Sequence, residues 1–127
     1  MSIPATGGYY SVNESNADKW LDGMGGKLEA LKESSGLGMR YVGSMVADMH
    51  RTLLKGGIFL YPADEKNTTG KLRLLYEAIP MGYLIENAGG KASCSADLAI
   101  LDVEPTGLHQ RVPVYLGSTS TVDSLLG

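Results

Sequence analysis

The sequence is poor in cysteine and histidine, with Cys94 as its single cysteine and two histidines among 127 residues. One cysteine excludes a disulfide within the chain, and so small a set excludes a zinc site built from several cysteines and histidines. No apolar run approaches the roughly 20 residues that a membrane helix needs. Residues 1–6 lack the basic and apolar regions of a secretory signal. These absences predict an intracellular protein in a reducing compartment, with no membrane partner.

Basic charge is also scarce, because 11 Lys and Arg stand against 14 Asp and Glu and give a net charge of −3. No basic run of the kind used for nucleic-acid binding occurs, so nucleic acid is not an expected partner. Apolar residues make up 43% and charged residues 20%, as in ordinary soluble globular proteins, and the length fits one domain over 1–127. The 17 glycines cluster between predicted elements, which is typical of a loop-rich α/β protein.

The first half of the chain predicts strand, helix, helix and strand. A strand is expected over 8–13, and a helix over 18–33 whose apolar set is Trp20, Leu21, Met24, Leu28 and Leu31. Glycines at 23, 25 and 26 cost about 1 kcal/mol each in a helix and should divide it into two pieces. After a flexible linker over 34–38, a second helix begins at an N-cap Ser44 and ends at Gly56. Its expected buried face is Met45, Val46, Met49 and Leu53, and a strand over 57–61 follows.

The second half predicts a long helix and then short strands. The helix should run from Lys71 to Ala88 with a kink at Pro80, and Gly89-Gly90 should end it. Its expected buried stripe is Leu72, Leu75, Tyr76, Ile79, Tyr83 and Leu84. Strands are expected over 91–94, 99–103 and 112–116, and a last helix after Ser118 or Thr119. This order predicts an α/β fold, a mixed sheet flanked by helices. Because both ends look unfinished, we expect a fragment or one half of a larger protein.

Glu77 lies beside the predicted kink, and two interpretations of this carboxylate stay open. A break in a helix next to a carboxylate is a mild sign that the side chain is aimed at a ligand. The alternative is a solvated ion pair with Arg73 one turn earlier, which contributes a few tenths of a kcal/mol. The residue pattern alone favours the ion pair.

Three other motifs predict structure and not chemistry. Gly89-Gly90-Lys91-Ala92-Ser93 resembles a phosphate loop only superficially, because its glycines end a helix and anions prefer helix beginnings. His50 and His109 have no nearby carboxylate or serine arrangement that suggests a triad, so both are expected to be structural or surface histidines. Cys94 lacks the electropositive surroundings of a reactive thiol and is expected to be inert.

Arg40, Tyr41, Tyr61 and Lys71 all fall at boundaries between predicted elements. Arginine offers a planar fork to a phosphate, lysine a point charge, and tyrosine a neutral hydrogen-bond donor. A phosphate monoester is therefore one possible ligand of these groups, although their spacing alone is weak support.

The same stretches carry a family resemblance. The runs at 40–53, 56–62 and 70–77 closely resemble the C-terminal domain of fructose-1,6-bisphosphatase, and shorter runs at 10–14, 86–90 and 108–113 extend the match in the same order. Sedoheptulose bisphosphatase, a related family, is less similar across 40–53. The resemblance covers essentially the whole chain. It implies the C-terminal half of the layered fold of the sugar phosphatases, which inositol phosphatases share.

The resemblance also implies roles for particular residues. Asn13, Tyr41, Tyr61 and Lys71 would hold the 6-phosphate of the substrate, and the backbone around Met45 and Leu72 would line the sugar. Arg40 would reach across a dimer interface into the site of the neighbouring subunit. Glu77 would bind a catalytic Mg²⁺, which reverses the interpretation favoured by the residue pattern. Two departures stand out: the family often has Asn-Glu-Gly-Tyr or Asn-Glu-Gly-Asn where this chain has Asn13-Glu14-Ser15-Asn16, and the segment between Asn13 and Arg40 is shortened and rich in glycine.

The implied reaction is Mg²⁺-dependent hydrolysis of the 1-phosphate of fructose 1,6-bisphosphate to fructose 6-phosphate, a step of gluconeogenesis or of Calvin-type metabolism. The implied partners are the N-terminal half of the enzyme and further copies in a dimer or tetramer, and the location is the cytoplasm or alternatively a plastid. The family's other metal carboxylates lie in an Asp-Pro-x-Asp-Gly-Ser motif and a Glu-rich loop that this sequence lacks. We therefore expect the chain to be inactive alone. The alternatives are a non-catalytic sugar-phosphate-binding or interaction domain, and a relative of sedoheptulose bisphosphatase.

Overall fold

A six-stranded mixed sheet forms the centre of the computed structural model, which describes residues 2–127 with the exception of the side chain of Asn16. The strands, in their order across the sheet, are β2 (Gly38–Met39), β1 (Tyr9–Ser11), β3 (Ile58–Tyr61), β8 (Val114–Gly117), β5 (Lys91–Ser95) and β6 (Leu98–Ala99). β1 runs parallel to both β2 and β3, and the remaining pairs are antiparallel. The predicted mixed sheet is therefore confirmed.

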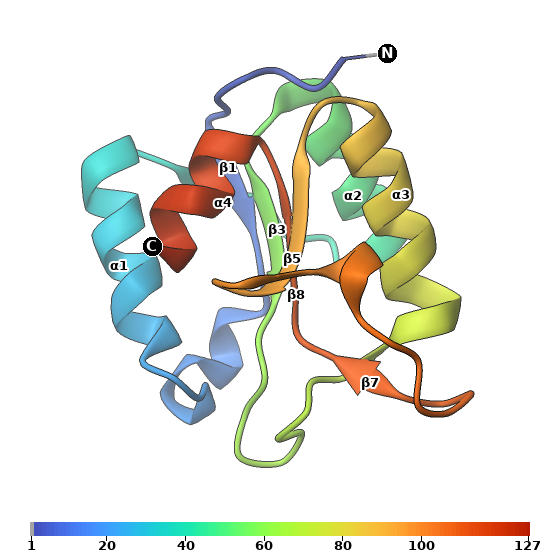
Figure 1. Cartoon of the computed structure of the whole chain (residues 1–127). Helices are drawn as coiled ribbons and strands as arrows, with labels where there is room; N and C mark the ends of the chain where they lie inside the picture. The colour runs from blue at the N-terminus through green and yellow to red at the C-terminus, as the bar shows by residue number, and fades with distance from the viewer. Residues whose placement is uncertain (1) are drawn as a thin grey trace.

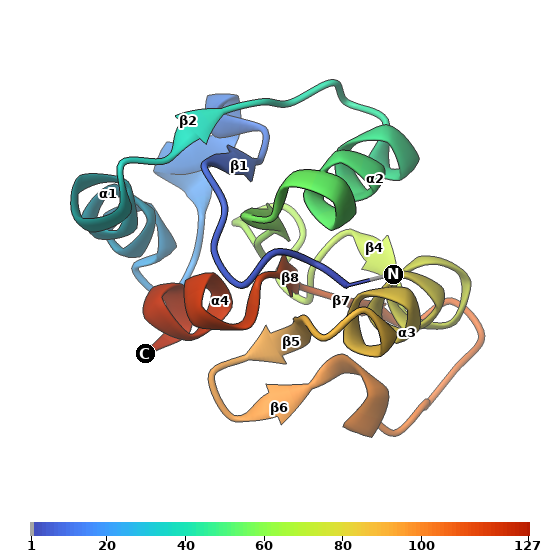
Figure 2. The same cartoon turned by 90° about the horizontal axis from the view of Figure 1, so that it is seen from above.

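Helices cover both faces of this sheet and give three layers (Figures 1 and 2). Helices α1 (Met24–Ser35) and α4 (Thr119–Leu126) lie on one face, and α2 (Met45–Lys55) and α3 (Ile79–Asn87) lie on the other. The other elements of the described chain are two 3₁₀ turns (Glu14–Lys19 and Ile100–Asp102), a π turn (Leu74–Ala78) and a two-stranded ladder of β4 (Leu72–Arg73) with β7 (Arg111–Val112). None of the helices in the described residues is long and apolar enough to cross a membrane.

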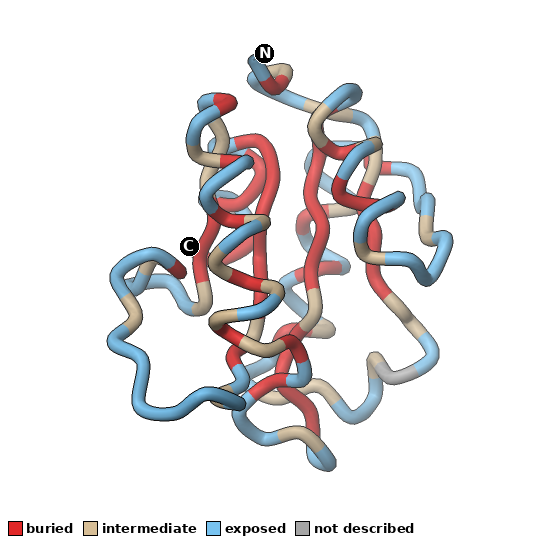
Figure 3. Tube along the Cα trace, turned by 90° about the vertical axis from the view of Figure 1, so that its right-hand side faces the viewer, coloured by how far each residue is buried: buried red, intermediate tan, exposed pale blue. Residues whose placement is uncertain are grey.

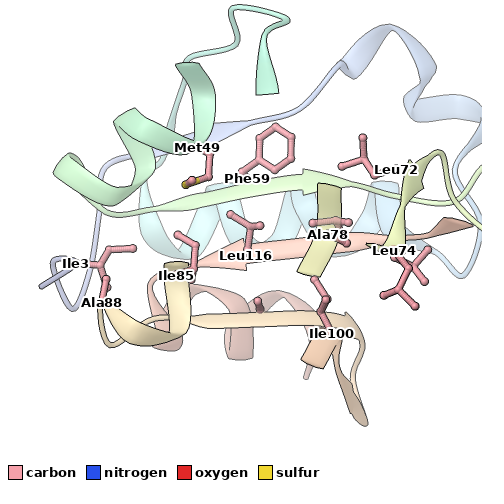
Figure 4. Packing of buried hydrophobic residues seen from close by; sticks show 13 residues of the cluster. Ile3, Met49, Phe59, Leu72, Leu74, Ala78, Ile85, Ala88, Ile100 and Leu116 are labelled. Carbon is pink, nitrogen blue, oxygen red and sulfur yellow. The ribbon is translucent and has the colours of Figure 1, made fainter. Parts of the chain in front are cut away.

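Alternation along the central strands divides the core into two clusters. Ile58 and Leu60 of β3 point toward α1 and α4, whereas Phe59 points toward α2 and α3. The same alternation on β8 places Tyr115 in the first cluster, between the sheet and helices α1 and α4, and Leu116 in the second cluster, between the sheet and helices α2 and α3. Figure 3 shows these strands as the most continuously buried part of the chain, and Figure 4 shows the second cluster around Phe59 and Leu116. Each fully buried side chain of this size contributes about 1.5–3 kcal/mol of hydrophobic stabilisation.

Two glycines let β3 and β8 approach each other at one end of their ladder. Gly57 and Gly117 have φ values of 104° and 151°, and a Cβ on Gly117 would lie 2.0 Å from the carbonyl oxygen of Gly57. Ser118 fixes the same corner, because its Oγ accepts from the Gly57 N–H at 3.0 Å and donates to the Pro4 carbonyl at 2.7 Å. Residues near both ends of the chain thus meet at one end of the central strand pair.

The prediction of one helix over 71–88 is wrong at its beginning. Leu72 and Arg73 form β4, the next five residues (Leu74–Ala78) form a π turn, and regular α-helix begins only at Ile79. A π turn inserts one residue per turn and so rotates the buried face of the helix that comes after it. Pro80 lies in the first turn of α3, where its missing N–H is tolerated.

The predicted buried stripe of this helix is wrong at three of its six residues for the same reason, whereas Leu72 is buried and Ile79 packs against the core as predicted. Tyr76, Tyr83 and Leu84 are exposed, and the helical segment buries Leu74, Ala78, Gly82, Ile85 and Ala88 instead. The face against the sheet carries small residues, because a Cβ on Gly82 would already lie 3.3 Å from Ala92 and 3.5 Å from Ile100.

Most of the other element predictions are confirmed with shifted bounds. The interrupted helix is found as the 3₁₀ turn and α1, with Met24, Leu28 and Leu31 buried as expected. The predicted linker over 34–38 begins inside α1 and ends on the first residue of β2, and the strand predicted over 99–103 is mostly the second 3₁₀ turn. Pro113, which has no N–H to donate, separates β7 from β8. Val46 is exposed and not buried, because α2 turns the polar residues Asp48 and Thr52 inward with Met49.

Candidate functional site

A cavity of about 450 Å³ opens between the beginning of α2, β3 and the π turn, on the α2–α3 side of the sheet. Its lining consists of Asn13, Tyr41, Gly43, Met45, Asp48, Phe59, Tyr61, Lys71, Leu72 and Glu77. All the site residues predicted from the sequence except Arg40 therefore lie around one hollow. Phe59 and Leu72 belong to the hydrophobic cluster of Figure 4 and, together with Met45, which packs against that cluster, form the apolar part of the lining. The polar groups come from four separate parts of the chain.

Lys71 and Tyr61 supply the cationic and phenolic groups. Tyr61 is the last residue of β3, and the Lys71 Nζ lies 6.0 Å from the centroid of its ring. Lys71 also lines a neighbouring cavity of about 280 Å³ together with Lys19 and Lys66. The positive charge of Lys71 is therefore available at the boundary between two hollows.

Asn13 caps the 3₁₀ turn that follows β1. Its Oδ1 accepts from the Ser15 N–H at 3.1 Å and from the Ser15 hydroxyl at 2.6 Å. The capping interaction occupies the oxygen of the amide and leaves the amide nitrogen as the group that an anion in the cavity can meet.

Tyr41 lies on the loop between β2 and α2. Burial raises the pKa of its phenol, and the nearby Tyr61 and Asp48 raise it further because they disfavour a second negative charge. The phenol therefore stays protonated and keeps its capacity to donate a hydrogen bond to an anion.

Arg40, the neighbour of Tyr41, lies outside the cavity. Its guanidinium stacks 5.0 Å from the centroid of the Tyr9 ring and donates to the Met39 carbonyl at 2.8 Å. The structure thus does not bring Arg40 together with the other predicted residues of the same chain. Its expected reach into a neighbouring subunit stays a prediction.

Asp48 and Arg51 are functional candidates that the sequence reasoning missed. Asp48 is fully buried, and its two oxygens accept from the N–H groups of Val42 at 2.9 Å and Gly43 at 3.2 Å. The Arg51 guanidinium donates to Asp48 at 2.8 Å, to the Arg40 carbonyl at 2.6 Å and to the Ser11 hydroxyl. The signal was present as polar residues at helical spacing, Asp48, Arg51 and Thr52, on the side of α2 that also carries Met49.

Glu77 fits both interpretations of the sequence. It lines the cavity, and its Oε1 also accepts from the Arg73 N–H at 2.9 Å and lies 3.8 Å from the Arg73 Nε. A glutamate that reaches back to the first N–H of a helix forms half of a capping box, usually from the third helical position. Here the π turn moves it to the fourth, which directs a half-buried carboxylate toward the cavity.

The donor set offers a divalent cation one available carboxylate. Glu77 and Asp48 are the acidic residues of the lining, and the oxygens of Asp48 are already paired with N–H groups and Arg51. Over residues 2–127, no three His, Cys, Asp or Glu side chains gather in a way that suits a metal ion. Mg²⁺ prefers six oxygen ligands, so Glu77 fits as a single ligand of a site that needs further oxygens.

The remaining titratable candidates lie away from the cavity. His50 is exposed, and His109 stacks on Tyr76 with ring centroids 6.1 Å apart. Cys94 is half-buried, and burial raises the pKa of its thiol, which disfavours the reactive thiolate.

Comparison with known proteins identifies what this arrangement resembles. The family model described as fructose-1,6-bisphosphatase, C-terminal domain, matches residues 3–126. The class 1 fructose-1,6-bisphosphatase of Persephonella marina is 58% identical over 127 residues, which are 99% of this chain and 39% of that protein. The cytosolic fructose-1,6-bisphosphatase of Oryza sativa subsp. indica is 49% identical over 131 residues, which are 100% of this chain and 38% of that protein. Relatives named as chloroplastic are also found.

A solved structure gives the same answer for the fold. The fructose-1,6-bisphosphatase of Leishmania major in its holo form superposes with a TM-score of 0.92 at 50% identity, over 98% of this chain and 39% of that one. The chain thus spans about two-fifths of the length of the relatives that it matches.

Proposed function

This chain belongs to the fructose-1,6-bisphosphatase family, because the model of that family's C-terminal domain matches residues 3–126. We propose that residues 1–127 form the sugar-6-phosphate-binding domain of such an enzyme. The complete enzyme hydrolyses the 1-phosphate of fructose 1,6-bisphosphate and leaves fructose 6-phosphate. The observation that carries this proposal is the cavity that gathers Asn13, Tyr41, Tyr61, Lys71 and Glu77.

The lining suits a phosphate that is bound and not cleaved. Lys71 supplies a positive charge, and the two tyrosines supply neutral donors that add no negative charge beside the dianion. The amide nitrogen of Asn13 supplies a further donor. Holding the remote 6-phosphate orients the reacting end of the sugar, and binding energy obtained away from the reaction centre lowers the barrier there. Met45 and Leu72 provide the apolar wall against which the sugar carbons lie.

Glu77 is proposed as one ligand of the catalytic Mg²⁺. When bound, such an ion polarises the phosphoryl group and activates the attacking water. The part contributed by this chain is one oriented carboxylate, held by the Arg73 N–H at 2.9 Å. The other ligands are expected from an N-terminal half that this sequence does not contain, so we expect no turnover by the chain itself.

The proposed partners are this N-terminal half and a second copy of the enzyme, toward whose site Arg40 would reach. Relatives with cytosolic and with chloroplastic names are both similar to the chain, so a cytoplasmic location is proposed with the plastid as the alternative.

Calorimetry and a phosphate-release assay on the purified chain test the proposal. Fructose 6-phosphate should bind, fructose without a phosphate should not, and fructose 1,6-bisphosphate with Mg²⁺ should release no phosphate. Absence of fructose 6-phosphate binding refutes the proposed site. Turnover by the chain alone refutes the claim that the remaining machinery lies elsewhere.

A non-catalytic sugar-phosphate-binding domain is a second candidate. The reading frame upstream of Met1 distinguishes the two, because a coding segment with an Asp-Pro-x-Asp-Gly-Ser motif supports the enzyme.

A further inference from the structure

We propose that Asp48 and Arg51 are positioning residues, which hold the Arg40–Gly43 loop in the conformation that presents Tyr41 to the sugar phosphate. The inference rests on the proposed function of the cavity. It assigns a supporting role in that function to Asp48 and Arg51, although neither side chain would touch a reacting atom.

The loop is fixed by hydrogen bonds on both sides of Tyr41. On the N-terminal side, the Arg40 N–H donates to the Tyr10 carbonyl at 3.0 Å, and the Arg40 carbonyl accepts from Arg51 at 2.6 Å. On the C-terminal side, the N–H groups of Val42 and Gly43 both donate to Asp48. Tyr41 thus lies between two anchors that belong to the same ion pair.

The loop has little else to define its conformation. β2 ends at Met39 and α2 begins at Met45. Within residues 2–127, Ser44 occupies the N-cap position but makes no side-chain hydrogen bond to the helix. Val42 is 67% exposed, so the loop gains little from hydrophobic burial. Its shape therefore depends mainly on Asp48 and Arg51.

The positive charge of Arg51 also balances the negative charge of Asp48 in the lining of the cavity. A carboxylate in the lining of a phosphate-binding cavity repels its ligand unless the negative charge is balanced. Arg51 lies 2.8 Å from the Asp48 Oδ1 and provides this balance inside the protein. Asp48 can then serve the loop without opposing the phosphate.

The position of the guanidinium is set by these contacts. Its terminal nitrogen reaches three acceptors, whereas the Arg51 Nε is buried without a partner in the described part of the chain. The two N–H groups of this nitrogen are shared among the three acceptors, and these contacts, not the unpaired Nε, hold the side chain in place.

Asp48→Asn is the decisive substitution, because it keeps the size of the side chain and replaces one acceptor oxygen by a donor. One of the two loop N–H groups then faces an amide nitrogen and loses its partner. We expect the Kd for fructose 6-phosphate to rise by about tenfold or more, as for the loss of a charge-assisted hydrogen bond. Amide hydrogen exchange at Val42 and Gly43 should accelerate. Asp102→Asn, the same chemical change at an exposed site, should alter neither quantity.

A double-mutant cycle with Tyr41→Phe separates positioning from general stability. If Asp48 acts through Tyr41, the double variant binds no more weakly than Tyr41→Phe alone. Additive losses, or an unchanged Kd in Asp48→Asn, overturn the inference. If Asp48→Asn does not fold, Arg51→Lys takes its place: it retains the charge but lacks the planar guanidinium fork, and it is expected to show the same loss and the same non-additivity.

The amide exchange measurement keeps this inference distinct from the proposed function. If the unsubstituted chain fails to bind fructose 6-phosphate, the proposed function fails. Exchange at Val42 and Gly43 that is unaffected by Asp48→Asn then also refutes the role of the pair in holding the loop. Accelerated exchange limited to these two amides supports that role.

Discussion

Replacing Lys71 by methionine should weaken fructose 6-phosphate binding without unfolding the protein. Methionine retains most of the length of the side chain and removes its charge. Lys71 is exposed apart from its approach to the Tyr61 ring, so little packing is lost. The effect should therefore appear in the ligand affinity and not in the thermal unfolding temperature.

The expected size follows from two estimates that agree. A hydrogen bond to a charged group contributes about 1.5–3 kcal/mol, and the exposure of Lys71 favours the lower end. Two unit charges 4 Å apart attract by about 1 kcal/mol in bulk water, which gives about 2 kcal/mol for a phosphate dianion. Since 1.4 kcal/mol corresponds to about a tenfold change in Kd, the Kd should rise by roughly 10–30-fold.

Titration calorimetry of fructose 6-phosphate at low and high salt measures both the loss and its origin. The unsubstituted chain should bind more weakly at high salt, and Lys71→Met should be less sensitive because one screened interaction is gone. Lys66→Met is the matched control, since Lys66 lines the neighbouring cavity but not the candidate site. An unchanged Kd in Lys71→Met, or an equal loss in Lys66→Met, would refute the assignment of the phosphate to this cavity.

Two further predictions concern stability. Gly117→Ala should lower the free energy of unfolding, measured by urea titration, by about 3 kcal/mol, because its Cβ would lie 2.0 Å from a backbone oxygen. Gly26→Ala, on the open face of α1, should instead raise the free energy of unfolding by about 0.5–1 kcal/mol. Equal effects of the two substitutions would contradict this reasoning. Hydrogen bonds from the backbone of Asn67 and then of Lys66 lower the pKa of Asp64 from its ordinary value of 3.8. Its stabilisation is therefore complete above that value and lost as the pH falls through the lowered pKa, so acid should destabilise Asp64→Asn less than the unsubstituted chain.

The family resemblance named Asn13, Tyr41, Met45, Tyr61, Lys71, Leu72 and Glu77, and all of them line one cavity. The residue pattern alone offered only Arg40, Tyr41, Tyr61 and Lys71 as phosphate ligands, and Arg40 lies outside that cavity. Tyr61 at the end of a strand and Lys71 at the end of a loop meet in the structure as expected. The dual position of Glu77 also explains why both interpretations of it were reasonable. An ion pair with Arg73 and a place in the cavity are compatible, because one carboxylate oxygen serves the backbone N–H of Arg73.

The π turn and the role of Asp48 were not predictable from local patterns. Apolar residues between 71 and 88 follow a helical period closely enough to suggest one helix, and the pattern carries no sign of the hydrogen-bond shift at Leu74. The buried face predicted for α2 held only apolar residues and left out Asp48, since isolated charges are rarely buried. Asp48 is buried because the N–H groups of Val42 and Gly43 in the preceding loop and the guanidinium of Arg51 one turn later supply its partners, and this arrangement requires the loop to fold back over the first turn of α2.

The pairing of β3 with β8 has a consequence for the order in which the molecule is built. Tyr61 is paired with Val114, and Phe59 with Leu116, so the strand that carries part of the cavity gains its central neighbour from the last 14 residues of the chain. Contacts between residues so distant in sequence form slowly, and domains generally fold as units during synthesis. A growing chain therefore completes the candidate site only after β8 has left the ribosome.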